Sequence, residues 1–365
     1  MKRIPQIDGL RAIAILLVIS FHYINNQLVN ATGTIAKFFC KATSFGWAGV
    51  DLFFVLSGFL IGSILIANKQ KNKYFSTFYI RRFVRIIPTY YLLIFLFMIV
   101  GSISFFKSNY FVAGNNVIPT WSYFFMLHNI FMGQINNMGN SAMSVTWSIG
   151  IEEQFYLIIP VIIYYIKNKW LPLLLVSFII LANIFRFYYS SPGVWIPAYV
   201  LLPCRMDAIS FGVLIAWVNS NCNLTTLTTK YFKQILFTMI STVAICAYLY
   251  LKYQDIGIIR NTLFALFFAC AIILALAKPN SYYGKILANK ILNWIGTISY
   301  SLYLFHYLII GIFNVIAATY FKNNGSLFGI STTILALLFT FLFSWLVYNY
   351  IEKPTVALGK KFNYN

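Results

Sequence analysis

Long apolar runs, each ended by a short polar segment, repeat along the whole chain. A membrane-spanning helix needs about 20 apolar residues, because it rises about 1.5 Å per residue across a hydrocarbon core about 30 Å thick. Ten runs reach that length, at residues 10–29, 46–67, 84–106, 147–166, 171–189, 197–218, 232–251, 258–277, 294–319 and 327–350. The pattern predicts an all-α, polytopic membrane helix bundle, with a membrane domain over 1–354 and a short basic cytoplasmic tail over 355–365.

One further apolar segment, residues 120–133, is short and contains His128 and Asn129. In a ten-span topology, 19 of the 27 Lys and Arg residues fall on the N-terminal side of the membrane. Because basic residues mark the cytoplasmic side, both termini are predicted to be cytoplasmic. An eleventh span at 120–133 would move Lys167, Lys169 and Lys230 to the other side. We therefore expect 107–146 to be one outer loop that contains an interfacial or re-entrant helix.

The composition agrees with a membrane protein, since 60% of the residues are hydrophobic, 9% are charged and the mean hydropathy is +0.77. A soluble chain carries about 25% charged residues. The net charge of +20 does not indicate nucleic-acid binding, because the basic residues cluster at the ends of apolar runs. The five cysteines form no C-x-x-C pair and have no histidine at metal-ligand spacing, so no metal site is expected.

Titratable residues inside or beside the apolar runs are the first candidates for chemistry. A charged group at the centre of a bilayer costs roughly 2.5–3.5 kcal/mol on insertion scales, so such groups usually have a function. The acidic ones are Asp8, Asp51, Glu152, Glu153 and Asp207, and the histidines are His22 and His306. They predict a membrane enzyme or a transporter. Buried structural ion pairs, such as Arg205 with Glu152, are the alternative interpretation.

Two features suggest where a donor and a base lie. Arg82 and Arg85 are three residues apart at the predicted cytoplasmic start of a helix, so they face the same way. Arginine binds phosphate with two parallel hydrogen bonds, which suits a phosphorylated ligand. His22 lies in the outer half of the first predicted span, and histidine is the usual general base near neutral pH.

The sequence resembles the acyltransferase 3 family of integral membrane acyltransferases. Six blocks occur in order: Asp8-Gly9-Leu10-Arg11 leading to His22, Gly49-Val50-Asp51 to Ile61, Arg82-x-x-Arg85-Ile-Ile-Pro88, Thr146-Trp147-Ser148 to Glu152-Glu153-Gln154-Phe155-Tyr156, Arg205-Met206-Asp207-Ala208, and Ser299-Tyr300 to His306. Gly150 replaces a residue that is often Ser. The chain also ends without the SGNH-type hydrolase domain that some members append, so we expect the membrane domain or a separate partner to complete the transfer.

The resemblance implies a multi-pass enzyme of the bacterial cytoplasmic (inner) membrane, among membrane lipids. It implies transfer of an acyl group, usually acetyl, from acyl-CoA as co-substrate, with no bound cofactor. The acceptor is expected to be a hydroxyl of an extracytoplasmic glycan or lipid-linked sugar, such as O-antigen, lipopolysaccharide or another cell-surface polysaccharide. The implied roles are catalysis for Arg11 and His22, with Glu152 or Glu153 orienting the imidazole, and acyl-CoA binding for Arg82 and Arg85. Arg205, Asp51, His306 and Trp147 are assigned to the oxyanion or acceptor site.

Two questions stay open at this point. His22 either deprotonates the acceptor or carries the acyl group covalently. A proton-coupled transporter or flippase of a lipid-linked sugar also suits intramembrane His, Glu and Arg. A transporter has no need for paired arginines at a cytoplasmic helix start, and this favours the enzyme.

Overall fold

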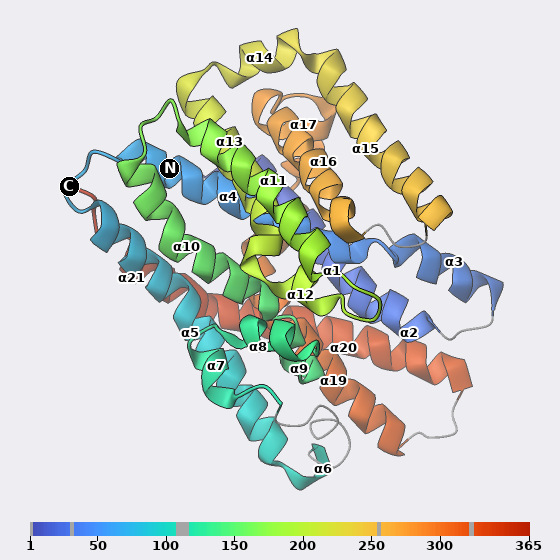
Figure 1. Cartoon of the computed structure of the whole chain (residues 1–365). Helices are drawn as coiled ribbons and strands as arrows, with labels where there is room; N and C mark the ends of the chain where they lie inside the picture. Colours follow the sequence, from blue (N-terminus) through green and yellow to red (C-terminus); the bar gives the residue numbers. More distant parts are fainter. Residues whose placement is uncertain (1–2, 30–32, 107–116, 254–256, 321–324) are drawn as a thin grey trace. The chain divides into compact units, whose positions relative to one another are not determined.

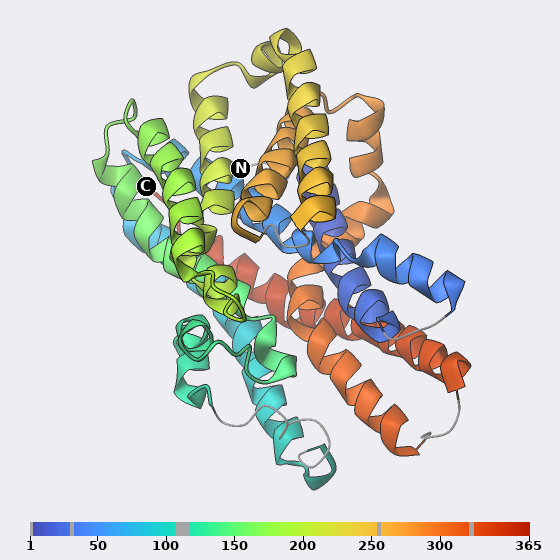
Figure 2. The same cartoon turned by 45° about the vertical axis from the view of Figure 1, so that its right-hand side comes forward.

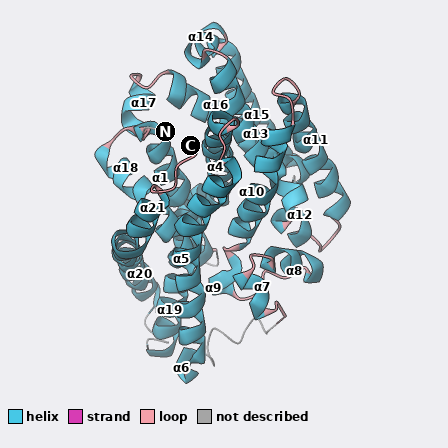
Figure 3. Cartoon of the chain, turned by 90° about the vertical axis from the view of Figure 1, so that its left-hand side faces the viewer, coloured by secondary structure: helices cyan, strands magenta, loops and turns pink. Residues whose placement is uncertain are grey.

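A computed structural model of the chain describes residues 3–29, 33–106, 117–253, 257–320 and 325–365, and nearly all of them are helical. Within these ranges no strand is present, and the only bridge is an isolated pair between Ser191 and Val194 (Figure 3). In the described part of the chain, ten helical segments are long and apolar enough to cross a membrane. The predicted all-α bundle of about ten spans is confirmed, whereas the cytoplasmic placement of both termini stays a prediction.

The chain divides into two compact units. Unit 1 comprises Met1–Leu16, Trp47–Tyr74 and Ile151–Thr297, and unit 2 comprises Leu17–Gly46, Phe75–Gly150 and Ile298–Asn365. Three α-helices, α1 (Pro5–Ser20), α5 (Tyr74–Ser102) and α10 (Trp147–Tyr165), contribute residues to both units.

Unit 1 is built mainly from long apolar helices. They are α4 (Gly49–Asn68), α11 (Leu171–Tyr189), α13 (Leu202–Asn221), α15 (Phe232–Tyr253) and α16 (Gly257–Ala277). Shorter helices connect them: α12 (Ile196–Val200), α14 (Leu224–Lys230), α17 (Tyr282–Leu287) and α18 (Lys290–Thr297). Helices α15 and α16 lie side by side in both views (Figures 1 and 2).

The most extensive helix packing in unit 1 joins α4 to α13. A Cβ atom at Gly58 would lie 2.0 Å from the backbone oxygen of Ile209, so only glycine permits this approach. Small residues at helix contacts are typical of membrane bundles, where close backbone packing replaces the hydrophobic effect. This contact brings Asp51 of α4 and Arg205 of α13 into the same unit core, where both are buried.

Unit 2 contains three long helices, α5 (Tyr74–Ser102), α19 (Ser299–Tyr320) and α20 (Gly325–Val347). Two π-helical turns also belong to it, η1 (Phe21–Asn25) and η4 (Tyr348–Glu352). Its shorter helices are α2 (Asn26–Leu28), α3 (Thr34–Thr43), α6 (Ser104–Phe106), α7 (Thr120–Phe124), α8 (His128–Ile135), α9 (Ser141–Ser144) and α21 (Lys353–Gly359). Helices α19 and α20 pack together over part of their lengths (Figure 1).

The segment at 120–133 is confirmed not to be a span. It is broken into α7 and α8 at Met126, whose φ of 57° lies in the left-handed region and ends the helix. Residues 107–116 of the predicted outer loop lie outside the described residues. The remainder of that loop folds into the short helices α7, α8 and α9.

Several predicted helix boundaries were wrong, two of them near the candidate residues. Helix α5 begins at Tyr74 and not at residue 84, because its first turns are amphipathic and bury Tyr74, Thr77 and Phe78. Arg82 and Arg85 are therefore two turns or more inside the helix. The span predicted to start at Trp294 is interrupted at Ile298, between α18 and α19.

Candidate functional site

His22 lies in the π-helical turn η1, which follows α1 directly. The Ser20 hydroxyl donates to the backbone oxygen of Leu17 at 2.7 Å. A Cβ atom at Gly46 would lie 2.3 Å from that same oxygen and 2.9 Å from the Cβ atom of Phe21. π-Helical turns inside α-helices often occur at functional sites. Here the turn determines how the His22 ring faces the rest of unit 2.

The His22 ring meets the ring of His306 on α19. The Nδ1 atom of His22 lies 3.0 Å from the Nε2 atom of His306. The Nδ1 atom of His306 lies 2.7 Å from the backbone oxygen of Tyr303 and 3.2 Å from that of Leu302. The Tyr307 ring packs against His22, with centroids 4.6 Å apart. We call His22, His306, Tyr303 and Tyr307 the histidine cluster.

A second contact fixes the backbone around the histidine cluster. The hydroxyl of Tyr23, the residue after His22, donates to the backbone oxygen of His306 at 2.8 Å and lies 2.7 Å from the Thr340 hydroxyl of α20. Tyr23, His306 and Thr340 are buried. Since both His22 and Tyr23 contact the same residue of α19, the π-helical turn is held at two points.

Tyr303 also connects α19 to the start of α10. Its hydroxyl donates to the backbone oxygen of Val145 at 2.8 Å and lies 2.6 Å from the Ser148 hydroxyl. A carbonyl oxygen only accepts, so the Tyr303 hydrogen goes to Val145. The Ser148 hydroxyl has two acceptors within reach, the Tyr303 oxygen and the backbone oxygen of Val145 at 3.3 Å. These bonds hold the helix start where Trp147 is buried. Ser148 and Tyr303 use their hydrogens within the protein.

Another buried histidine supports the short helices of the predicted outer loop. His128 stacks on Tyr123 with ring centroids 4.7 Å apart, and its Nε2 atom lies 3.0 Å from the Thr146 hydroxyl oxygen. That hydroxyl donates to the backbone oxygen of Met143 at 2.6 Å, so it accepts from His128. Burial disfavours the imidazolium ion and lowers the pKa of His128 to about 4. His128 is therefore a neutral packing residue.

Arg82 and Arg85 lie on α5, where both side chains are half-buried. The next residue, Ile86, accepts a hydrogen bond of 3.0 Å at its backbone oxygen from the Tyr300 hydroxyl of α19. Arg81 donates to the backbone oxygen of Phe362 at 2.8 Å and lies over the Tyr364 ring. The predicted basic tail thus packs on α5 beside the paired arginines.

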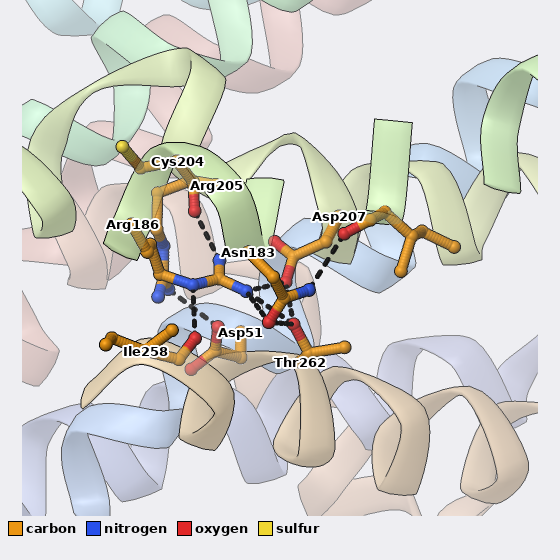
Figure 4. A network of polar contacts seen from close by, with 9 residues as sticks. Asp51, Asn183, Arg186, Cys204, Arg205, Asp207, Ile258 and Thr262 are labelled. Carbon is orange, nitrogen blue, oxygen red and sulfur yellow. Dashed lines mark hydrogen bonds and ion pairs between the residues drawn. The ribbon is translucent and has the colours of Figure 1, made fainter. Parts of the chain in front are cut away.

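Unit 1 contains a buried cluster of opposite charges, which Figure 4 shows from close by. Arg205 donates to Asp51 at 2.6 Å, and Arg186 donates to Asp207 at 2.8 Å. Each of these four side chains is at most 1% exposed. They come from the helices α4, α11 and α13. We call these four residues the ion-pair cluster.

Further hydrogen bonds hold Arg186 rigidly within the ion-pair cluster. It donates to the backbone oxygens of Cys204 and Ile258 and to the side chains of Asn183 and Thr262. Thr262 in turn donates to Asp207 at 2.6 Å. A guanidinium group offers five N–H donors, and this network occupies most of them.

The other candidates of unit 1 have local partners. Arg11 lies 3.9 Å from the carboxylate of Asp8, which precedes it by about one helical turn. Glu152 accepts from the Tyr156 hydroxyl at 3.0 Å, and that hydroxyl also contacts the Ser57 hydroxyl of α4. Glu153 neighbours Glu152 on α10.

The structure therefore divides the predicted site residues. His22, His306, Trp147, Arg82 and Arg85 lie in unit 2, whereas Arg11, Asp51, Glu152, Glu153 and Arg205 lie in unit 1. The ion pair suggested for Arg205 was with Glu152, and the structure pairs Arg205 with Asp51. The partner at Nδ1 of His22 is His306, a role that the sequence analysis gave to Glu152 or Glu153.

Arg186 and Tyr303 were not identified from the sequence. Arg186 had a detectable signal, since it is a lone cation in the last turn of an apolar helix. Tyr303 had only its place in the block from Ser299 to His306, which does not distinguish it from the other residues there.

Comparison with known proteins gives a consistent result. The family model Acyl_transf_3, described as an acyltransferase domain, matches residues 4–349. The chain is 30% identical, over 97% of its length and 56% of the relative's, to the peptidoglycan O-acetyltransferase OatA of Listeria monocytogenes. It is 29% identical, over 98% and 56% respectively, to the putative peptidoglycan O-acetyltransferase YrhL of Bacillus subtilis. It is 28% identical, over 99% and 58%, to the O-acetyltransferase OatA of Staphylococcus aureus.

The chain spans a little more than half the length of these curated relatives. No solved structure matches it.

Proposed function

This chain belongs to the acyltransferase 3 family, and from that premise we propose that it is a membrane O-acetyltransferase acting on a cell-surface glycan. The donor is acetyl-CoA bound from the cytoplasm, and the acceptor is a glycan hydroxyl on the outer side of the bacterial cytoplasmic membrane. Two of the relatives described above are named for peptidoglycan, which makes peptidoglycan the first acceptor to test. O-antigen, lipopolysaccharide and other surface polysaccharides are the next.

One observation carries the proposal: α19 contacts both predicted sites of unit 2. Its Tyr300 bonds to the backbone of α5 next to Arg85, and its His306 bonds to His22. Six residues separate Tyr300 from His306, which is about 9 Å along the axis of an α-helix. A single helix thus links the paired arginines to the histidine cluster. This supports a donor whose phosphates lie at one site and whose thioester reaches the other.

The reaction needs one proton acceptor and no cofactor. The Nε2 atom of His22 removes the proton of the acceptor hydroxyl as its oxygen forms a bond to the thioester carbonyl carbon. The tetrahedral intermediate then expels the sulfur, and the proton returns from His22 to give free CoA and the acetyl ester. Trp147, at the start of α10, is kept as the proposed oxyanion donor, a contribution typically worth about 3–4 kcal/mol.

The roles expected of Arg11, Asp51, Glu152, Glu153 and Arg205 stay predictions. These five residues lie in unit 1, where their described contacts are with residues of the same unit. A structural role for the ion-pair cluster explains Asp51 and Arg205 equally well.

The test is mass spectrometry of cell-wall glycans from cells that express the full chain, its His22→Ala variant or neither. An acetyl-sized mass increase is expected with the full chain only. Isotope-labelled acetyl-CoA supplied to the cytoplasmic face of inverted vesicles should label the product. Acetylation by His22→Ala at the level of the unmodified chain would disprove the assignment. Movement of a lipid-linked sugar without any acetyl product would instead identify a transporter.

A further inference from the structure

The two ring nitrogens of His306 have partners of different kinds, and this locates its proton. Nδ1 lies within hydrogen-bond distance of the backbone oxygens of Tyr303 and Leu302. A carbonyl oxygen only accepts, so Nδ1 carries the hydrogen. In a neutral imidazole the other nitrogen is then an acceptor. The Nε2 atom of His306 therefore presents a lone pair.

The surroundings of His306 favour its neutral form. The side chain is fully buried. Among the residues that the structure describes, no carboxylate forms an ion pair with His306 or with His22. A buried charge without a counter-ion is costly. A neutral His306, with its hydrogen on Nδ1, satisfies both of its ring nitrogens without adding such a charge.

We propose that His306 is a positioning residue that fixes the tautomer of His22. Because Nε2 of His306 accepts, the Nδ1 atom of His22, 3.0 Å away, must donate. The hydrogen of the neutral His22 ring is thereby placed on Nδ1, and its Nε2 atom is left unprotonated. This inference rests on the proposed function, in which Nε2 of His22 receives the hydroxyl proton.

The backbone contact of Tyr23 makes this arrangement rigid. Tyr23 donates to the backbone oxygen of His306, so the two histidines are held together independently of their rings. The backbone oxygen of Val18 also accepts a hydrogen bond from the His22 ring. Without the second acceptor at His306, the neutral ring would populate more of the tautomer with its hydrogen on Nε2. That tautomer cannot accept a proton at the reacting atom. His306 thus acts through His22 and does not touch the substrate.

The direct test is NMR of the full chain, labelled with ¹⁵N-histidine and held in lipid nanodiscs. The chain has three histidines, so three rings are observed and single replacements assign them. His22 and His306 are expected to carry their hydrogens on Nδ1. His128 is expected to carry it on Nε2, because the Thr146 hydroxyl accepts from it, and it serves as an internal reference. A hydrogen on Nε2 of His22 in the unmodified chain would overturn the proposal.

A matched pair of variants tests the consequence for activity. In His306→Gln the side-chain oxygen falls close to the position of Nε2 and accepts from His22, whereas His306→Leu has no acceptor. Replacing the group that fixes a catalytic imidazole costs about 10⁴-fold in kcat in serine proteases. We expect His306→Gln to retain activity within about tenfold, and His306→Leu to lose about 10²- to 10⁴-fold in kcat with an unchanged KM for acetyl-CoA. Equal activity of the two variants would refute the positioning role.

Different results would disprove the catalytic role of His22 and the positioning role of His306. Full activity of His22→Ala would remove His22 from the reaction, whatever the NMR spectrum shows. Unchanged His128 signals in each variant establish that it is folded. Should His306→Leu fail to fold, the His306→Gln variant still decides, because full activity with the hydrogen on Nε2 of His22 would contradict the proposal.

Discussion

Arg205 donates to Asp51 across 2.6 Å, and neither side chain is more than 1% exposed. Breaking a buried pair leaves an uncompensated charge, which typically costs about 3–5 kcal/mol. We therefore expect Arg205→Met to destabilise the protein by that amount, and Arg205→Met with Asp51→Leu to cost much less. Thermal unfolding in detergent measures both. A double variant as unstable as the single one would contradict the pairing.

The exposed pair of Arg3 with Asp8 is the matched control. Arg3 is 62% exposed in its side chain, and exposed ion pairs contribute about 0–1 kcal/mol. Arg3→Met should therefore lower the unfolding temperature far less than Arg205→Met does.

Arg82 and Arg85 are expected to bind the phosphates of the donor. Each Arg→Ala change should weaken acetyl-CoA binding by about 1.5–3 kcal/mol, because charge-assisted hydrogen bonds are lost. Isothermal titration with the purified protein measures this loss. Lys71→Ala and Lys73→Ala are the controls, since both lysines are exposed and precede α5. Equal losses from the lysine variants would indicate a diffuse basic surface and no specific site.

The pKa of His128 predicts a loss of stability in acid. Burial lowers this pKa from its ordinary value of 6.5 to about 4, so between these values the unfolded chain binds more protons than the folded one. The free energy of unfolding should therefore fall as the pH falls, by about 2 kcal/mol between pH 7.5 and pH 5.

The His128→Phe variant isolates this effect. Phenylalanine keeps the stacking on Tyr123, and the Thr146 hydroxyl still donates to Met143. Chemical denaturation measures the free energy of unfolding of the unmodified chain and of the variant. The difference between these two free energies should shrink as the pH falls. An identical pH dependence in both would show that His128 does not titrate as proposed.

Gly46 should be intolerant of any side chain. A Cβ atom there would lie 2.3 Å from the Leu17 backbone oxygen, which cannot move without shifting the π-helical turn. Gly46→Ala should cost about 1–3 kcal/mol in stability, and acetylation should fall further because His22 follows Phe21. Gly33→Ala is the control, since nothing lies within 4 Å of its Cβ position. Normal glycan acetylation by Gly46→Ala would contradict this packing argument.

The ten-span topology can be tested with reporter fusions. A reporter after Lys167 should be cytoplasmic, and one inserted between Asn136 and Asn140, after α8, should be external. An external reporter at Lys167 would require another span before it and would reverse the assignment of the inner face.

The fold was largely predictable, because each apolar run of about 20 residues corresponds to one membrane span. The start of α10 at Trp147 was also predicted, since the polar loop before it ends there. The start of α5 was missed because Arg81, Arg82 and Arg85 interrupt the apolar run, although arginine stems are compatible with a helix at a membrane surface.

The side-chain partners were less predictable. His22 and His306 are 284 residues apart, and no local pattern indicates that they meet. Arg205 was expected near a carboxylate, but hydropathy does not distinguish Asp51 from Glu152. The π-helical turn at Phe21–Asn25 was also missed, since no local sequence pattern distinguishes it from a continued α-helix.

Because of that π-helical turn, the number of residues in this helical segment determines which way the side chains on either side of it face. A π-helical turn accommodates an extra residue in an α-helix, and one residue corresponds to about 100° of rotation. Deleting Ile24 would let the backbone form a regular α-helix. The residues before the deletion would then be rotated about the helix axis relative to the residues after it. Either His22 would leave His306, or Asn25 would leave the Cys40 backbone oxygen to which it donates at 2.6 Å. The length of this segment, and not only its composition, is therefore under constraint.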